Sequence, residues 1–206
     1  MLSGSFEYDS DDSLAIFKDH IERAHKIDCT IVAFQSEDDH RSLELIDDTD
    51  VLMVFTRRIN TIGLELDRFK RYCQQGRPIV GVRTASHAFQ NWLDFDREIL
   101  GGNYGNHYGE GPTVGVQIVP EAYGHPVLKG ITDLESKGSL YRNTPIADDT
   151  TLLLNGITDE ASEPVAWTRT NLGGRVFYTS LGHQNDFRND RFLRLLTNAV
   201  LWVVGV

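Results

Sequence analysis

Four short polar segments hold the residues that could do chemistry, and each lies beside an apolar run of the sequence. They are residues 5–8 (SFEY), 83–89 (RTASHAF), 101–112 (GGNYGNHYGEGP) and 182–187 (GHQNDF). Imidazole and carboxylate groups transfer protons, and a guanidinium group binds a carboxylate, a phosphate or a polarised carbonyl oxygen. In an open α/β sheet, ligands collect at the carboxyl ends of the strands. We therefore expect these segments to converge on one site.

Arg83, His183 and Glu7 are the expected catalytic residues. His183 follows the apolar run 175–181 and a glycine, so its ring should stand at a strand end as a general acid/base or a ligand. Arg83 opens the turn after another predicted strand, where it could polarise a substrate oxygen or pair structurally with Glu7 or Asp186. Glu7 is the expected carboxylate partner of a histidine, and the alternative is a solvated loop acid.

The expected substrate-binding residues surround this set. Tyrosine and asparagine neighbours of His107 suit the binding of sugar hydroxyls, although the same bonds could simply hold the loop together. Ser86 and His87 are adjacent at a predicted helix start, where neighbouring side chains point about 100° apart. We therefore expect His87 to cap the helix or line the site, and not to form a nucleophile pair with Ser86. The substrate-binding set is His107, Tyr8, Asn106, His87 and Asp186.

No cofactor is predicted from these segments. The side chains of His107, His183, Glu7 and Asp186 are of types that bind metals, but dedicated spacing such as His-x-x-x-His is absent. We predict no metal site and keep a divalent metal as the minor alternative. The run Gly109-Glu110-Gly111 lacks the Lys-Ser/Thr of a phosphate-binding loop, so nucleotide binding is not supported.

An alternation of apolar runs and amphipathic segments must position these residues. The expected strands of the first half are 28–34, 51–56 and 78–82, with the end of another at 1–4. One helix should follow the capping segment 9–13, a short one should cover 43–46, and another should end at Gly76. Their expected apolar faces are Leu14, Phe17, Ile21 and Ala24 in the first helix, and Ile62, Leu66, Phe69 and Cys73 in the last. This βαβ pattern predicts a parallel sheet covered on both faces.

The second half is richer in strand. The expected strands are 113–119, 151–155, 164–169 and 175–181, and the loop 170–174 (TNLGG) suits a hairpin turn. Asn189-Asp190 should cap a final helix whose apolar face is Phe192, Leu195, Leu196, Ala199, Val200 and Val203. We therefore predict a three-layer α/β sandwich, mostly parallel, with an antiparallel extension near the C-terminus.

The composition of the chain limits the classes of molecule that it is expected to bind. The chain has 206 residues and a formal net charge of −10, which repels nucleic acid and anionic membranes, so a small polar ligand is expected. Two cysteines provide no disulfide framework, and no apolar stretch approaches the length of a spanning helix. We expect a soluble protein that is cytoplasmic, or exported if an upstream signal has been removed.

Four motifs follow one another along the chain: 78–89 (PIVGVRTASHAF), Gly101-Gly102 followed by Asn106-His107, His125-Pro126-Val127, and 174–183 (GGRVFYTSLGH). Taken in this order, they resemble the ThuA-like (trehalose utilisation) family of the class I glutamine amidotransferase-like superfamily. The resemblance covers nearly the whole chain and implies one flavodoxin-like domain over residues 1–206. It also implies a carbohydrate, namely a sugar or keto-sugar, as ligand, and a homodimer.

The superfamily's amidotransferases carry a cysteine nucleophile on the turn after a central strand and a histidine after a late strand. Arg83 stands at the matching turn position, and His183 matches the histidine, although Gln184-Asn185 departs from the His-Pro-Glu pattern. Cys73 is expected on the core face of a helix. We therefore expect acid/base chemistry without glutaminase activity. The alternative is a non-catalytic module that binds a carbohydrate or a protein.

Overall fold

The computed structural model describes residues 1–111 and 113–206; Pro112, the last residue of the segment 101–112, lies outside the described residues. In this part of the chain the α-helices are α1 (Ser10–Ala24), α2 (Gly63–Gln74) and α3 (Asp190–Val204). The strands are β1 (Leu2–Gly4), β2 (Val32–Ala33), β3 (Leu52–Thr56), β4 (Ile79–Val82), β5 (Asn106–Tyr108), β6 (Val114–Ile118), β7 (Leu134–Ser136), β8 (Leu140–Arg142), β9 (Thr151–Ile157), β10 (Ser162–Asn171) and β11 (Gly174–Thr179).

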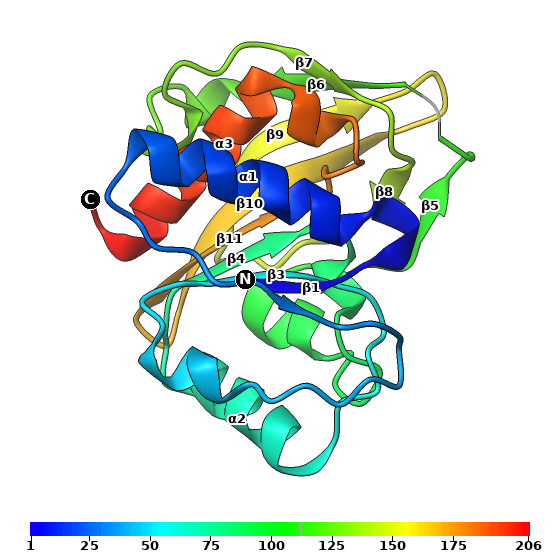
Figure 1. Ribbon diagram of the computed structural model, residues 1–206. Coiled ribbons are helices and arrows are strands. Elements are labelled where there is room, and N and C mark those ends of the chain that lie inside the picture. Colours follow the sequence, from blue (N-terminus) through cyan, green and yellow to red (C-terminus); the bar gives the residue numbers. More distant parts are fainter. Residues whose placement is uncertain (112) are drawn as a thin grey trace.

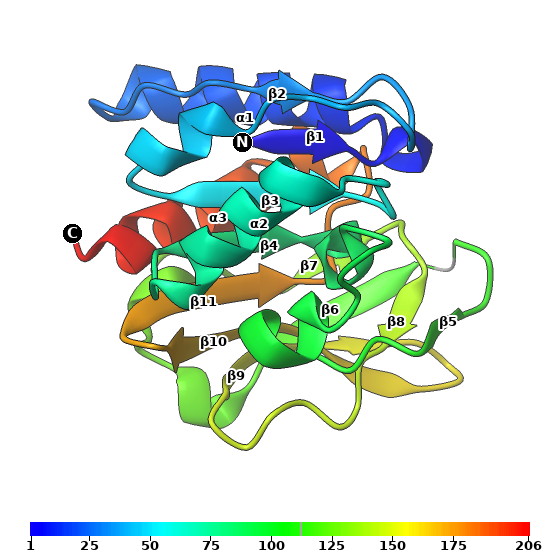
Figure 2. The same cartoon turned by 90° about the horizontal axis from the view of Figure 1, so that it is seen from below.

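Nine of the described strands form one mixed sheet in the order β2-β1-β3-β4-β11-β10-β9-β6-β7. The first five of these pair in parallel, and β10, β9, β6 and β7 continue the sheet in antiparallel pairs. Figure 2 shows β1, β3, β4 and β11 pointing the same way, with β10 reversed beside them. Strands β5 and β8 pair separately as a short antiparallel ladder. The predicted sheet with its antiparallel extension is confirmed.

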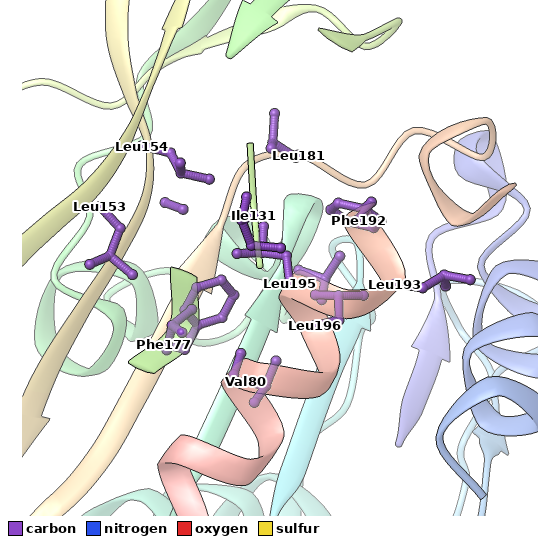
Figure 3. Packing of buried hydrophobic residues seen from close by; sticks show 14 of the residues in the cluster. Val80, Ile131, Leu153, Leu154, Phe177, Leu181, Phe192, Leu193, Leu195 and Leu196 are labelled. Carbon is purple, nitrogen blue, oxygen red and sulfur yellow. The ribbon is translucent and has the colours of Figure 1, made fainter. Parts of the chain in front are cut away.

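Helices cover both faces of this sheet. Helices α1 and α3 lie on one face, and α2 lies on the other with the short 3₁₀ helix Glu44–Asp48 (Figure 1). Each face buries its own apolar cluster, and part of the cluster under α3 is drawn in Figure 3. The predicted three-layer α/β sandwich is therefore confirmed. No helix in the described residues is both long enough and apolar enough to cross a membrane.

The predicted helix faces are largely those observed. Leu14, Phe17 and Ile21 of α1 are buried, whereas Ala24 at its end is exposed. The six predicted apolar residues of α3 are all buried, and the Asn189 side chain accepts the N–H of Arg191 as a helix cap. These periodic apolar faces stabilise the helices mainly through packing on the sheet.

Two expectations from the first half are wrong. The run 28–34 was expected to be a buried strand, but only Val32–Ala33 pair, and both are half-buried because β2 is the outermost strand of the sheet. Ile62 was assigned to the apolar face of α2 but precedes the helix and is 61% exposed. In both cases an apolar residue type was mistaken for a packed position.

The predicted hairpin joins β10 to β11. Its two turn residues, Leu172 and Gly173, both have positive φ values, which match the right-handed twist of a two-residue hairpin. Gly76 also has a positive φ of 64° and ends α2 as predicted. A Cβ on Gly76 would collide with the carbonyl oxygen of Leu172, so bare backbone lets the end of α2 pack on the hairpin tip.

Candidate functional site

Parallel pairing brings the ends of β1, β4 and β11 to one edge of the sheet. The segments that follow these strands carry Tyr8, Arg83 and His183. Arg83 Nη2 donates to the Tyr8 hydroxyl at 3.0 Å, and the rings of Tyr8 and His183 meet edge to face with centroids 6.2 Å apart. The predicted convergence at the carboxyl edge thus holds for these three residues.

Arg83 forms the centre of the cluster. It follows β4 directly with a φ of 45°, a left-handed conformation that non-glycine residues seldom adopt, and its side chain is only 1% exposed. Its guanidinium donates to the carbonyl oxygens of Ser180 at 2.7 Å and Ser139 at 3.4 Å. The rings of Tyr8 and Tyr141 lie 4.2 and 4.7 Å from the guanidinium carbon. Arg83 is therefore a fixed cation between aromatic rings.

No carboxylate forms an ion pair with Arg83 among the described residues. The partners considered from the sequence, Glu7 and Asp186, are replaced by backbone carbonyls and a tyrosine hydroxyl. Burial lowers the pKa of Arg83, but Tyr141, Tyr8 and Asp186 favour the charged form and the net shift is upward. The guanidinium thus stays positive, and its field acts on the groups around it.

Asp186 builds the turn that carries His183. Its side chain is 3% exposed, and Oδ2 accepts the N–H groups of Gly182 and His183, each at 2.9 Å, and the hydroxyl of Ser136 at 2.7 Å. Burial raises the pKa of Asp186. With three donors on this one oxygen, Asp186 acts as the anchor of the loop.

The His183 ring is half-buried at the mouth of this turn. Its Nδ1 accepts the N–H of Asn185 at 3.2 Å, and Nε2 has no hydrogen-bond partner among the described residues. Burial lowers the pKa of His183, and the positive charge of Arg83 lowers it further. The negative charge of Asp186 raises it, but the net shift is downward. The imidazole is therefore held toward its neutral form, with Nε2 left for another molecule.

His87 lies at the other end of the cluster. Its ring is 6% exposed and stacks on Tyr104, with centroids 4.5 Å apart and planes 17° apart, and Tyr104 in turn lies 4.5 Å from Tyr141. Contrary to the expectation from helical spacing, the Ser86 hydroxyl lies 3.0 Å from His87 Nδ1. The α-helical rule does not apply, because the segment Arg83–His87 is one tight 3₁₀ turn that begins with the left-handed residue Arg83.

The remaining predicted residues lie outside this cluster. Glu7 is exposed and pairs with Arg57 at 3.3 Å, so in the described residues it contacts no histidine. Asn106 and His107 are exposed on β5, where His107 Nδ1 lies 2.9 Å from the carbonyl oxygen of Gly109. The backbone of His107 pairs with Tyr141, which places β5 beside the cluster without a side-chain contact among the described residues.

Sequence reasoning missed Tyr141 and Asp96. Tyr141 lies on β8, whose three residues are too few to show an alternation. Asp96 begins the π-helical turn Asp96–Leu100, and its Oδ2 accepts the N–H of Tyr104 at 2.7 Å. Asp96 thereby fixes the tyrosine that stacks on His87. A single acid in a mixed polar segment carries no signal of burial, so the sequence offered no means to find it.

The buried cysteine Cys73 and a cavity of the protein lie outside the cluster around Arg83. Cys73 is buried near the end of α2, which precedes β4, whereas Arg83 follows β4 at the other end of that strand, and burial raises the pKa of the Cys73 thiol. No group of three or more His, Cys, Asp or Glu side chains in residues 1–111 and 113–206 could hold a metal ion. A cavity of about 710 Å³ lies at the opposite, amino edge of the strands, lined by residues that include Met1, Thr49 and Val206.

Comparisons with known proteins agree with this architecture. The model of the family ThuA, described as trehalose utilisation, matches residues 3–203. A ThuA-like protein from Bacteroides uniformis is 20% identical with a TM-score of 0.73, over 98% of this chain and 89% of its own. A second, from Parabacteroides merdae, is 17% identical with a TM-score of 0.77, over 99% and 88%. A cytoplasmic protein from Salmonella typhimurium is 15% identical with a TM-score of 0.63, over 92% and 86%.

These identities are low, so the solved structures establish a shared fold and nothing more specific. No curated protein matches the chain. The chemistry must therefore be argued from the cluster itself.

Proposed function

Because the chain belongs to the ThuA, or trehalose utilisation, family, we propose that it acts on a sugar or keto-sugar by acid/base chemistry. The observation that carries the proposal is the buried Arg83, without an ion-pair partner among the described residues, set between Tyr8 and Tyr141, with Tyr8 in turn against His183. Tyr141 is 2% exposed and only holds the guanidinium, whereas Tyr8 is half-buried, and a tyrosine ring with a flat apolar face and a polar edge suits a sugar ring. A fixed cation beside an imidazole suits a reaction in which negative charge develops on a substrate oxygen.

His183 is the proposed general acid/base. A neutral ring that accepts the Asn185 N–H at Nδ1 carries its proton on Nε2, so action as a base requires this 3.2 Å bond to open and the proton to move to Nδ1. The ring is half-buried, so water can reach it and exchange that proton. A free Nε2 takes a proton from the carbon next to a carbonyl, and the same atom returns it to the neighbouring carbon. This transfer isomerises a keto-sugar without a covalent intermediate.

Arg83 and Tyr8 stabilise the oxygen that becomes negative. The Tyr8 hydroxyl accepts a hydrogen bond from Arg83, so its own O–H is left to donate, and no acceptor for it is present among the described residues. A tyrosine that accepts from a buried guanidinium is a strengthened donor. Electrostatic stabilisation of this kind supports isomerisation better than acyl transfer, which needs a nucleophile.

Glutamine hydrolysis is not part of the proposal. The turn that would carry the thiolate holds Arg83, and Cys73 is buried in the layer on the other face of the sheet from α3. A thiol whose pKa is raised by burial is a poor nucleophile.

The test follows trehalose, keto-disaccharides, hexoses and glutamine by NMR in the presence of the purified protein, of His183→Ala and of His40→Ala. His40 is exposed and makes no hydrogen bond or ring contact with the cluster among the described residues, so its variant is the matched control. We expect turnover of one sugar class, lowered roughly 10²–10⁴-fold in His183→Ala with binding retained. Release of ammonia from glutamine would contradict the proposal. Binding of a sugar without turnover would favour the carbohydrate-binding module instead.

A further inference from the structure

The Ser86 hydroxyl has two acceptors within hydrogen-bond geometry, and the Tyr178 hydroxyl lies near it as well. Its Oγ lies 3.0 Å from His87 Nδ1 and 3.4 Å from the carbonyl oxygen of Arg83. That carbonyl already accepts the hydroxyl of Tyr178 at 2.7 Å. The Nδ1 contact is the shorter of the two, and Nδ1 has no other donor among the described residues, so the geometry favours the Ser86 proton pointing at the ring over the Arg83 carbonyl or the Tyr178 hydroxyl. An imidazole that accepts at Nδ1 carries its own proton on Nε2.

The surroundings of His87 keep this ring uncharged. It is buried, and the charged groups that face it are arginines: Arg57 and Arg58 from the segment after β3, and Arg83 from its own turn. The titratable groups packed on it are the tyrosines Tyr104 and Tyr141. Burial, with the three arginine charges, lowers the pKa of His87 to about 3. A ring in this environment gives a hydrogen bond without becoming an imidazolium.

We propose that His87 is a second catalytic residue of the site, whose Nε2–H donates to the carbonyl oxygen of the sugar, and that Ser86 is the positioning residue that fixes its tautomer. The role rests on the proposed function. Nε2 has no hydrogen-bond partner among the described residues, while Nδ1 is occupied and one ring face is covered by Tyr104. The donor atom is therefore the part of the ring left for a ligand.

The electron balance assigns separate tasks to the two histidines. When His183 takes the proton from carbon, the C–H electron pair forms a carbon–carbon double bond and the carbonyl pair moves to oxygen. The N–H of His87 stabilises that oxygen and stays on nitrogen, because a neutral imidazole is a weak acid. The hydroxyl group on the carbon that lost its proton then gives its own proton to this oxygen, so the negative charge passes to the other oxygen. When His183 returns its proton to the former carbonyl carbon, the double-bond pair forms the new C–H bond and the charged oxygen forms the new carbonyl group.

The first measurement is a ¹⁵N–¹H NMR spectrum of the histidine rings in the full chain from pH 5 to pH 9. We expect His87 to keep one neutral pattern with the proton on Nε2 throughout, and Ser86→Ala to give a mixture of tautomers. A proton on Nδ1, or protonation of His87 within this range, would overturn the proposal. These spectra need no substrate, so they are independent of whether any sugar turns over.

The second measurement uses trehalose, lactulose and D-fructose with the His183→Ala variant, which binds without reacting. The Nε2–H signal of His87 should shift when the bound sugar carries a carbonyl group, and a constant signal at saturation would reject the donor role. For the sugar that turns over, His87→Ala should lower kcat roughly 10²–10³-fold at an unchanged pH profile, and His87→Gln should recover part of it. If no sugar turns over while the NMR signal shifts, the proposed reaction fails and the donor role stands.

Discussion

Replacing Asp96 by asparagine should make the stability of the protein much less dependent on pH. Asp96 is 4% exposed, and its Oδ1 is buried without a hydrogen-bond partner among the described residues. Burial raises the pKa of this carboxyl from 3.8 to about 7, against the N–H of Tyr104 and the charge of Arg97, which lower it. Asparagine keeps an oxygen for the Tyr104 N–H but has no charge to desolvate.

The sign of the effect follows from the direction of the shift. The folded state holds the Asp96 proton more tightly than the unfolded state, so its contribution to stability is complete below about pH 4 and lost as the pH rises to about 7. A shift of about three pKa units corresponds to about 4 kcal/mol in total. Of this, about 2–3 kcal/mol is lost between pH 5 and pH 8.

The assay is urea unfolding followed by tryptophan fluorescence at pH 5 and pH 8. At each pH we compare the free energy of unfolding of Asp96→Asn with that of the unaltered protein. The difference, variant minus unaltered protein, should rise by about 2–3 kcal/mol from pH 5 to pH 8. Asp159→Asn, at an exposed loop acid, is the control and should give the same difference at both. A constant difference for Asp96→Asn would refute the argument, because it would mean that this carboxyl is not desolvated.

Two further substitutions test the scaffold. Asp186→Ala removes the acceptor of the Gly182 and His183 N–H groups and should cost about 2–4 kcal/mol in urea unfolding, with loss of activity. Asp186→Asn, which keeps an oxygen, should cost distinctly less, and equal costs would contradict the anchoring role. Leu195→Ala, at a fully buried position of α3 (Figure 3), should cost about 2–5 kcal/mol without altering the His183 ring signals in NMR. A cost below 1 kcal/mol would mean that α3 packs more loosely than described.

The sequence predicted those parts of the fold that repeat a period over many residues. The helix faces of α1 and α3 span several turns, so each apolar position is supported by its neighbours at i+3 and i+4. The loop 170–174 was recognisable because only certain residues tolerate the positive φ of a hairpin turn. The short strands β2, β5, β7 and β8 were not predicted correctly. Each has two or three residues, which is too few to show a pattern, and its pairing depends on segments far away in the sequence.

The site was predictable where topology alone brings residues together. Tyr8, Arg83 and His183 each follow a parallel strand, and parallel strands end at one edge. Glu7 was assigned to a histidine on residue type, whereas the structure pairs it with Arg57. Contacts of this kind depend on side-chain torsions, which sequence spacing does not determine.

The backbone at Arg83 has a consequence for substitution at this turn. Arg83 holds a left-handed conformation, and its side chain ties the Ser180 and Ser139 carbonyls and Tyr8 together. A single change to cysteine would place a thiol on this turn and at the same time strip those buried carbonyls of their donor. One substitution therefore cannot turn this position into a nucleophile without loosening the three segments that meet at it.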